Sequence, residues 1–250
     1  MNEVINQLKS RKSVRVFEDR LIEMDKKNEI INAALEAPTA GAMMLYSIID
    51  ITAPELKEKL AVLCDNQPFI AKAPMVLIFL ADYQRWYDTF VYTDCNPRTP
   101  ETGDLLLAYS DALIAAQNTV VAAESLNIGS CYIGDIIENC EEVRDLLKLP
   151  EYVMPAAMLV YGYPTKQQKN RTKPARFNKE YIVFENSYQK LSLDEHRRMY
   201  EQKEQKAGHD KSHDQSNYAD NIQAFCKRKY MSDFCKEMSR SANEYLKNFK

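Results

Sequence analysis

A long apolar segment over residues 104–136 most constrains what this chain can fold into. Asp104 is a suitable N-cap and Gly129 a suitable stop, so the sequence predicts a helix over 105–126. Its apolar residues lie on nearly all sides, which is typical of a helix buried in a large core or a membrane. Asp111 and three further polar residues interrupt it, which argues against a membrane span. We therefore expect the central helix of a soluble domain.

Composition excludes several classes of function. The chain has 250 residues, a net charge of −3 and 45% hydrophobic residues, so no general basicity favours nucleic acid or an anionic membrane. The N-terminal stretch contains no apolar core of a secretory signal, and we expect a cytoplasmic protein. In a chain of this length, irregularly spaced cysteines are more typical of reduced thiols than of a disulfide framework. They are Cys64, Cys95, Cys131, Cys140, Cys226 and Cys235.

Hydrophobic periodicity predicts alternating helices and strands on both sides of the central helix. We expect helices over 3–10 and 25–36, one starting at Pro54, and a short one over 141–147; strands are expected over 47–51, 75–81 and 156–162. Residues 82–103 mix aromatic residues with two X-Pro pairs. A loop of that length inside a compact domain is commonly functional, so we expect it to resemble a lid.

The composition changes towards the C-terminus. Residues 201–217 contain one alanine as their only apolar residue and predict a polar linker, while 218–249 show the apolar spacing of an amphipathic helix. We therefore divide the chain into a main domain over 1–186 and a C-terminal extension over 187–250. His209 and His213 have a spacing that suits a metal on a helix, but no third ligand is recognisable, so we expect no metal site.

Two basic groups, far apart in the sequence, suit a phosphate. Arg11, Ser13 and Arg15 place two guanidiniums and a hydroxyl on one face if the segment is extended. The second group follows the last expected strand and comprises Lys166, Lys169, Arg171, Lys173 and Arg176. Each group also fits a solvated surface loop. From the local sequence alone, the surface loop is the commoner interpretation. Both groups together would form one anion site.

The remaining polar positions favour a bound cofactor over side-chain catalysis. Gln67 is placed to bind a ligand's ring edge, although solvation at the surface is the simpler account, and the turn over 129–135 offers backbone amides with little steric bulk. Cys131 has no histidine before residue 196 to activate it, so a Cys–His nucleophile is improbable. No hydrolase motif or nucleotide-binding glycine loop is present. This absence fits chemistry carried by a cofactor.

Taken in order, the motifs resemble the FMN-dependent nitroreductase family. They are R-K-S-V-R-V-F, E-A-P-T-A-G-A-M-M-L-Y, N-Q-P-F-I-A-K-A-P, G-S-C-Y-I-G-D-I after the long helix, and V-Y-G-Y-P with a trailing K-P-A-R. The match covers roughly residues 3–185. The resemblance implies an α+β fold in which helices flank a mixed central sheet around a long buried helix. It also implies a homodimer with FMN at the interface.

The resemblance also implies which residues bind FMN. Arg11, Ser13 and Arg15 correspond to the family's phosphate-binding residues, and Lys173 and Arg176 complete that site. Pro38, Thr39 and Ala40 correspond to the segment along the isoalloxazine ring. Gln67 corresponds to a flavin-contacting glutamine, and Ile133 and Gly134 to the segment facing the flavin N5 edge. No side chain is assigned as catalytic.

The implied reaction is a ping-pong transfer in which NADH or NADPH reduces FMN and the flavin then reduces a nitroaromatic, quinone or flavin acceptor. One residue departs from the pattern, because many members have Asn where this chain has Ala42. Loss of one neutral hydrogen bond is worth on the order of 1 kcal/mol. Together with the unusual C-terminus, this leaves a second hypothesis open, namely a flavin-binding sensor, storage or interaction protein with little turnover. A dehalogenating or flavin-fragmenting member of the same fold is a third.

Overall fold

The structure is a computed structural model that describes residues 2–208 and 215–250. Its contacts group the described residues into two units. The first contains the chain up to Arg171 together with Asp233–Lys250, and the second contains the described residues between Thr172 and Ser232. From the sequence we expect a different boundary, at residue 186, between the flavin domain and the C-terminal extension. This boundary stays a prediction.

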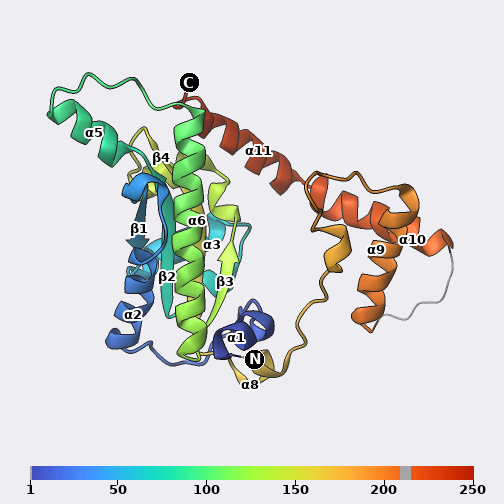
Figure 1. Ribbon diagram of the computed structural model, residues 1–250. Helices are drawn as coiled ribbons and strands as arrows, with labels where there is room; N and C mark the ends of the chain where they lie inside the picture. The colour runs from blue at the N-terminus through green and yellow to red at the C-terminus, as the bar shows by residue number, and fades with distance from the viewer. Residues whose placement is uncertain (1, 209–214) are drawn as a thin grey trace. The chain divides into compact units, whose positions relative to one another are not determined.

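A four-stranded sheet forms the centre of the first unit (Figure 1). Its strands lie in the order β1-β2-β4-β3, and every neighbouring pair is antiparallel. An isolated parallel bridge joins Ser13 to Ser130 at the β3 edge, and it makes the pairing mixed at that edge. The strands are β1 (Tyr46–Asp50), β2 (Met75–Asp82), β3 (Gly129–Ile133) and β4 (Val153–Gly162). The three expected strands and the α+β class are confirmed.

Helices cover both faces of this sheet because β2 and β4 are buried on both sides. Leu77 and Phe79 of β2 pack with α2 and α6, whereas Val76 and Ile78 pack with α3, α4 and α7. Side chains alternate along a strand, so two apolar layers follow from one continuous apolar run. The helices are α2 (Met24–Leu35), α3 (Pro54–Leu63), α4 (Pro68–Ala71), α6 (Thr102–Ser125) and α7 (Cys140–Leu147).

The central helix α6 begins earlier than we expect from the sequence. Glu101, not Asp104, is its N-cap, and Asp104 lies at the third helical position, where its side chain accepts the Glu101 amide at 2.8 Å. Arg98 binds the Asp104 carboxylate through both terminal nitrogens, at 2.6 and 2.9 Å. A carboxylate at the third helical position accepts the free amide of the N-cap residue, and this explains why the helix begins earlier. By length and composition α6 would be able to span a membrane, but it packs as the core helix of this unit.

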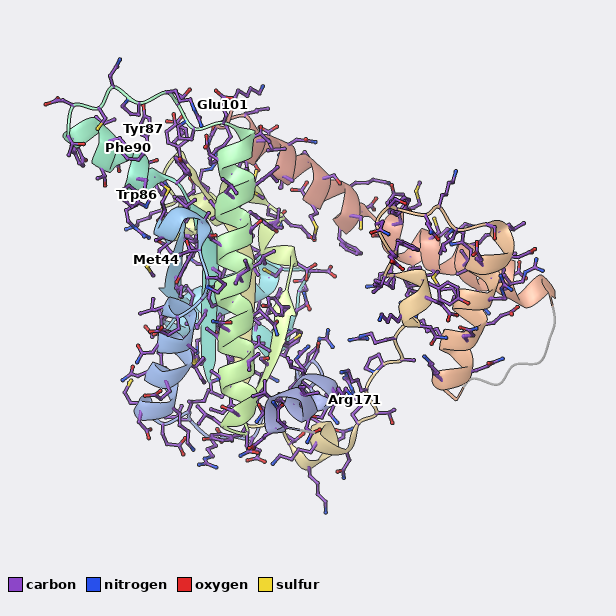
Figure 2. The ribbon with its side chains drawn as sticks, in the orientation of Figure 1. Met44, Trp86, Tyr87, Phe90, Glu101 and Arg171 are labelled. Atoms are coloured by element: carbon purple, nitrogen blue, oxygen red, sulfur yellow. The ribbon has the colours of Figure 1, made fainter. Side chains whose placement is uncertain are left out.

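The expected loop over 82–103 is wrong for its first half, and a role of the segment as a lid stays a prediction. Residues Gln84–Tyr92 form the helix α5, and an irregular segment follows up to Glu101. Trp86 donates from Nε1 to the Met43 carbonyl at 2.6 Å, and Figure 2 shows Trp86, Tyr87 and Phe90 projecting from α5. The Trp86 hydrogen bond stabilises α5. From the local sequence alone, the mixture of aromatic residues in this segment resembles a loop.

The N-terminal segment crosses the edge of the sheet at very short range. After α1 (Glu3–Ser10), Val14 donates its amide to the Ser130 carbonyl at 2.9 Å. A Cβ built on Gly129 would lie 2.6 Å from a Val14 methyl group, and one on Gly162 would lie 2.6 Å from the Phe17 ring. Only glycine allows this approach. The two glycines therefore determine where the segment after α1 lies.

We predict that Gly129→Ala destabilises the fold by about 1–3 kcal/mol, the usual cost of adding a methyl group to a packed contact. The free energy of unfolding in urea measures it. Gly103→Ala is the matched control, because a Cβ on Gly103 meets nothing within 4 Å. Equal stabilities of the two variants would contradict the close packing of Val14 on β3.

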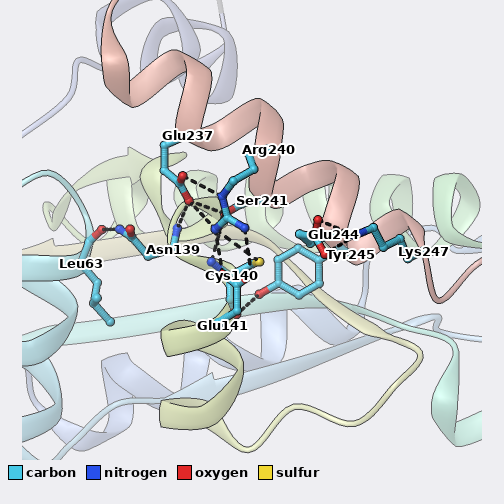
Figure 3. A network of polar contacts seen from close by, with 10 residues as sticks. All are labelled: Leu63, Asn139, Cys140, Glu141, Glu237, Arg240, Ser241, Glu244, Tyr245 and Lys247. Carbon is cyan, nitrogen blue, oxygen red and sulfur yellow. Dashed lines mark hydrogen bonds and ion pairs between the residues drawn. The ribbon is translucent and has the colours of Figure 1, made fainter.

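The C-terminal helix α11 (Asp233–Leu246) docks on the start of α7 through a polar network (Figure 3). Glu237 accepts the Asn139 amide at 3.1 Å, and Ser241 accepts the Cys140 amide at 3.0 Å. Hydrogen bonds from Arg240 and Ser241 lower the pKa of Glu237 to about 2. A carboxylate at a helix N-terminus satisfies free amides and complements the helix dipole. These contacts place α11 in the first unit.

The structure corrects two expectations about the C-terminal part of the chain. The expected linker is helical at its start, because α9 (Leu193–Lys206) begins with a capping box between Ser192 and Glu195. The expected single helix over 218–249 is divided into α10 (Gln215–Phe225), a π turn over Cys226–Tyr230 and α11. Met231 donates its amide to Cys226 five residues back, which ends the α-helical pattern there.

Candidate functional site

A cluster of positive charge surrounds Cys131 on β3. Burial raises the pKa of this thiol, whereas the Arg15 guanidinium, a hydrogen bond with Ser13, and the guanidiniums of Arg11 and Arg171 act to lower it. The structure therefore brings Arg11, Ser13 and Arg15 together over one strand. It adds Arg171, whose Nη2 donates to the Ser13 carbonyl at 3.4 Å and which lies beside α1 in Figure 2.

Lys12 holds the loop that carries Arg171. Its Nζ donates to the carbonyls of Lys169 and Arg171, at 2.6 and 2.5 Å. The buried side chain of Gln168, in the short helix α8 (Lys166–Asn170), accepts the Arg15 amide at 3.4 Å. The part of the second basic group up to Arg171 thus reaches the first group, as the joint-site hypothesis requires.

Lys173 and Arg176 belong to the second unit. Their part in this cluster stays a prediction.

One atom of the cluster indicates an anion. Among the described residues, the buried Nε of Arg11 has no hydrogen-bond partner. A buried donor without a partner is costly, and a phosphate oxygen is the partner that a guanidinium prefers. Three arginines and a serine hydroxyl at one place therefore fit a phosphate group.

The loop over 38–44 is held by a carboxylate of the central helix. Asp111 is buried, and its oxygens accept the Thr39 hydroxyl, the Ala40 amide at 3.0 Å and the Leu45 amide at 3.1 Å. The Thr39 hydroxyl in turn accepts the Met44 amide at 2.8 Å. Pro38, just before this network, is exposed. Thr39 and Ala40 are thus rigidly placed at the surface of α6.

Ala42 has a left-handed backbone, with φ at 58°. Asn and Gly tolerate this conformation better than Ala does, since Ala pays a steric cost of roughly 1–2 kcal/mol there. An Asn at this position would therefore be favoured by the backbone conformation alone, apart from any ligand contact. Arg85 of α5 stabilises the same loop by donating to the carbonyls of Met44 and Tyr46, at 3.2 and 2.8 Å.

Gln67 and the turn after β3 meet directly. The Gln67 Nε2 donates to Asp135 Oδ2 at 2.7 Å and to the Cys64 carbonyl at 2.8 Å. Ile133 is buried at the end of β3, and Gly134 follows it at the surface. A Cβ built on Gly134 would meet no atom within 4 Å, so the space in front of this glycine is open. A flat ligand fits against such a turn.

Glu138 is buried just behind this turn, with 4% of its surface exposed. Burial is the main cause that raises the pKa of its carboxyl to about 7, and Asp135, Asp65 and Glu237 add repulsion. Among the residues that the structure describes, its Oε1 has no hydrogen-bond partner. The fold therefore holds this carboxyl in its protonated form below neutral pH.

We predict that Glu138 makes the protein less stable as the pH rises. Below about pH 4.5 the carboxyl is protonated in both states, and between about 4.5 and 7 the unfolded chain loses the proton first. The free energy of unfolding falls by at most roughly 3 kcal/mol over this pH range. Glu138→Gln should therefore gain stability over the wild type across this window, as measured by urea unfolding at pH 4.5 and 8.

The exposed α7 residue Glu142 provides the control, as Glu142→Gln. A stability gain for Glu138→Gln that does not change with pH would show that the Glu138 pKa is not raised.

The sequence aligns with one family model, the nitroreductase family, over residues 8–163. A relative from Bacillus subtilis (strain 168) named FMN reductase (NADPH) is 30% identical over 254 residues, which cover 97% of this chain and all of that protein. The chain belongs to the nitroreductase family.

Two solved structures extend this similarity to the fold. NADPH:FMN oxidoreductase from Vibrio harveyi, complexed with NAD⁺, has a TM-score of 0.80 and 26% identity, with 98% of both chains covered. An oxidoreductase from Bacteroides fragilis, described as putative in its name, has a TM-score of 0.84 and 27% identity over 98% of both chains. The similarity to these two structures therefore covers almost the whole chain.

Sequence reasoning did not single out several residues of this site. Asp111 was visible as a carboxylate inside an apolar helix, which is a signal for a buried polar role. Arg171 belonged to a recognised basic group but was not chosen from it. Asp135 and Glu138 gave no local signal, because Asp135 contacts Gln67, which is distant in the sequence, and Glu138 is buried. His209 and His213 lie outside the described residues, and elsewhere in the described chain no three acidic, His or Cys side chains gather as a metal site.

Proposed function

We propose that this member of the nitroreductase family is an FMN-dependent oxidoreductase that takes its electrons from NADPH. The observation that carries the proposal is the convergence of Arg11, Ser13, Arg15 and Arg171 on one strand, with an orphaned guanidinium nitrogen among them. The relatives named as NADPH-dependent FMN reductases support both the cofactor and the reductant.

The residues present fit FMN along one path. Arg11, Ser13 and Arg15 would hold its phosphate, with Arg171 and, as the sequence predicts, Lys173 and Arg176. Pro38, Thr39 and Ala40 would line the ring on the α6 side. Gln67 and the Ile133–Gly134 turn would meet its polar edge. When bound, FMN supplies hydride chemistry between NADPH and an acceptor of the nitroaromatic, quinone or flavin class.

We further propose a homodimer, because α6 turns an apolar row away from its own sheet. Leu106, Leu107 and Ile114 are 62%, 52% and 40% exposed. An exposed apolar patch of this kind is typical of an interface, and a second copy of α6 would cover it. Light scattering should give twice the chain mass, and a Leu107→Glu variant should be monomeric. A monomeric wild type would contradict this proposal.

We also propose a cytoplasmic location. All six cysteines are free, although Cys226 and Cys235 are only partly buried, and this fits a reducing compartment. Disulfide formation in protein isolated from cells under thiol-blocking conditions would contradict it.

The visible absorption spectrum tests the function. We expect flavin bands near ~450 nm that bleach anaerobically within seconds of adding NADPH and return when a quinone or nitroaromatic is added. Bands that persist after NADPH is added would favour the second hypothesis, a flavin-binding protein with little turnover. A protein that neither contains nor binds FMN would overturn the proposal.

We predict that Arg11→Ala and Arg171→Ala each weaken FMN binding by roughly 10- to 100-fold, the worth of one charge-assisted hydrogen bond. Quenching of flavin fluorescence on titration measures the dissociation constant. Lys59→Ala is the control, since it removes an exposed positive charge from α3, outside both basic groups. If all three variants behave alike, the cluster at Cys131 is not the phosphate site.

A further inference from the structure

The loop before β1 turns through a left-handed residue that carries a long side chain. Met44 has φ at 51°, and it follows Gly41 and Ala42, which have φ at 56° and 58°. A left-handed backbone is sterically unfavourable for methionine. Conformations of this kind concentrate at functional sites and persist only where neighbouring groups enforce them. The groups that enforce this one lie on α5 and α6.

The peptide unit between Met43 and Met44 is fixed at both ends. Trp86 of α5 donates from Nε1 to the Met43 carbonyl at 2.6 Å. The amide of the same unit, which belongs to Met44, donates to the Thr39 hydroxyl at 2.8 Å. A flip of this unit would take the φ of Met44 out of the left-handed region, and it would break both hydrogen bonds. Trp86 and Thr39 therefore set the φ of Met44 from the two ends of one peptide unit.

The peptide unit after Met44 is fixed in the same way. Arg85 Nη1 donates to the Met44 carbonyl at 3.2 Å, and the Leu45 amide donates to Asp111 Oδ2 at 3.1 Å. Arg85 is itself held, because its Nη2 lies 3.2 Å from Oδ2 of the buried Asp82. The carbonyls on both sides of Met44 thus depend on α5, and the Leu45 amide depends on α6.

We propose that Arg85 and Trp86 are positioning residues of the flavin site, which hold the loop in the course that presents residues 40–42 to the isoalloxazine ring. This role rests on the proposed function, because the contact of the loop with the ring is part of that proposal. Both side chains act through the carbonyls beside Met44. When the loop leaves this course, the apparent dissociation constant of FMN rises in inverse proportion to the fraction of molecules that keep it.

The first experiment measures the dissociation constant of FMN for the wild type, Trp86→Phe and Arg85→Lys. Trp86→Phe keeps an aromatic ring but loses the donor, and we expect FMN to bind about two- to fivefold more weakly. Arg85→Lys keeps a positive charge beside Asp82 but loses the fork that reaches two carbonyls, so a loss of about fivefold is expected. Tyr87→Phe is the control, because it removes a hydroxyl from the next residue of α5 and keeps the ring against Tyr152.

The second experiment repeats the Trp86→Phe comparison in two backgrounds, Met44→Gly and Met44→Ala. Both backgrounds remove the methionine side chain, but only glycine adopts the left-handed conformation without a steric cost. The loss of FMN affinity caused by Trp86→Phe should therefore persist in the Met44→Ala background and largely disappear in the Met44→Gly background. A hydrogen bond that contributes only to the packing of α5 gives the same loss in both backgrounds, because its effect is then independent of Met44.

The outcomes separate this role from the proposed function. An FMN affinity that changes in neither Trp86→Phe nor Arg85→Lys would overturn the positioning role and leave FMN binding intact. Equal losses in the glycine and alanine backgrounds, or an equal loss in Tyr87→Phe, would also overturn it. A wild type that binds no FMN would contradict the proposed function and this role together. Arg85→Lys takes the place of Trp86→Phe in both experiments if Trp86→Phe does not fold.

Discussion

The site depends on one buried carboxylate in the central helix. Asp111 accepts from the Thr39 hydroxyl and from the amides of Ala40 and Leu45, so it fixes the loop between α2 and β1 against α6. A buried carboxylate is stable only if its oxygens are satisfied, and this loop supplies the donors. The positions of the helix and the loop therefore depend on each other. A large apolar helix buries the charge, and the charge determines where the ligand-facing backbone lies.

A second constraint is steric and acts at the other end of the sheet. Gly129 and Gly162 let the segment after α1 lie against β3 and β4, and this contact brings Arg11, Ser13 and Arg15 over Cys131. Lys12 then holds the loop after β4 by its carbonyls, so a third arginine joins the cluster. Three segments that are distant in the sequence thus form one positive surface.

Periodicity was sufficient to predict most of the fold, because β2, β4 and α6 have continuous apolar runs whose period is unambiguous. It failed for α5, whose helix is stabilised by Trp86 reaching Met43, a contact between distant segments. Of the candidate site residues that the family motifs predicted, the structure brings Arg11, Ser13 and Arg15 together near Cys131 and places Gln67 against the turn after β3. Glu138 was beyond reach, because its raised pKa comes from burial and from acidic neighbours on α11 and after α3. No local pattern of residues encodes such surroundings.

We propose above all that the cluster around Cys131 binds the phosphate of a flavin mononucleotide. Calorimetric titration of the flavin-free protein with FMN and with riboflavin tests it directly, since the two ligands differ only in the phosphate. We expect FMN to bind at least about 100-fold more tightly than riboflavin, because its phosphate accepts two or more charge-assisted hydrogen bonds. Equal affinities would contradict it, because a flavin would then bind without using Arg11, Arg15 and Arg171.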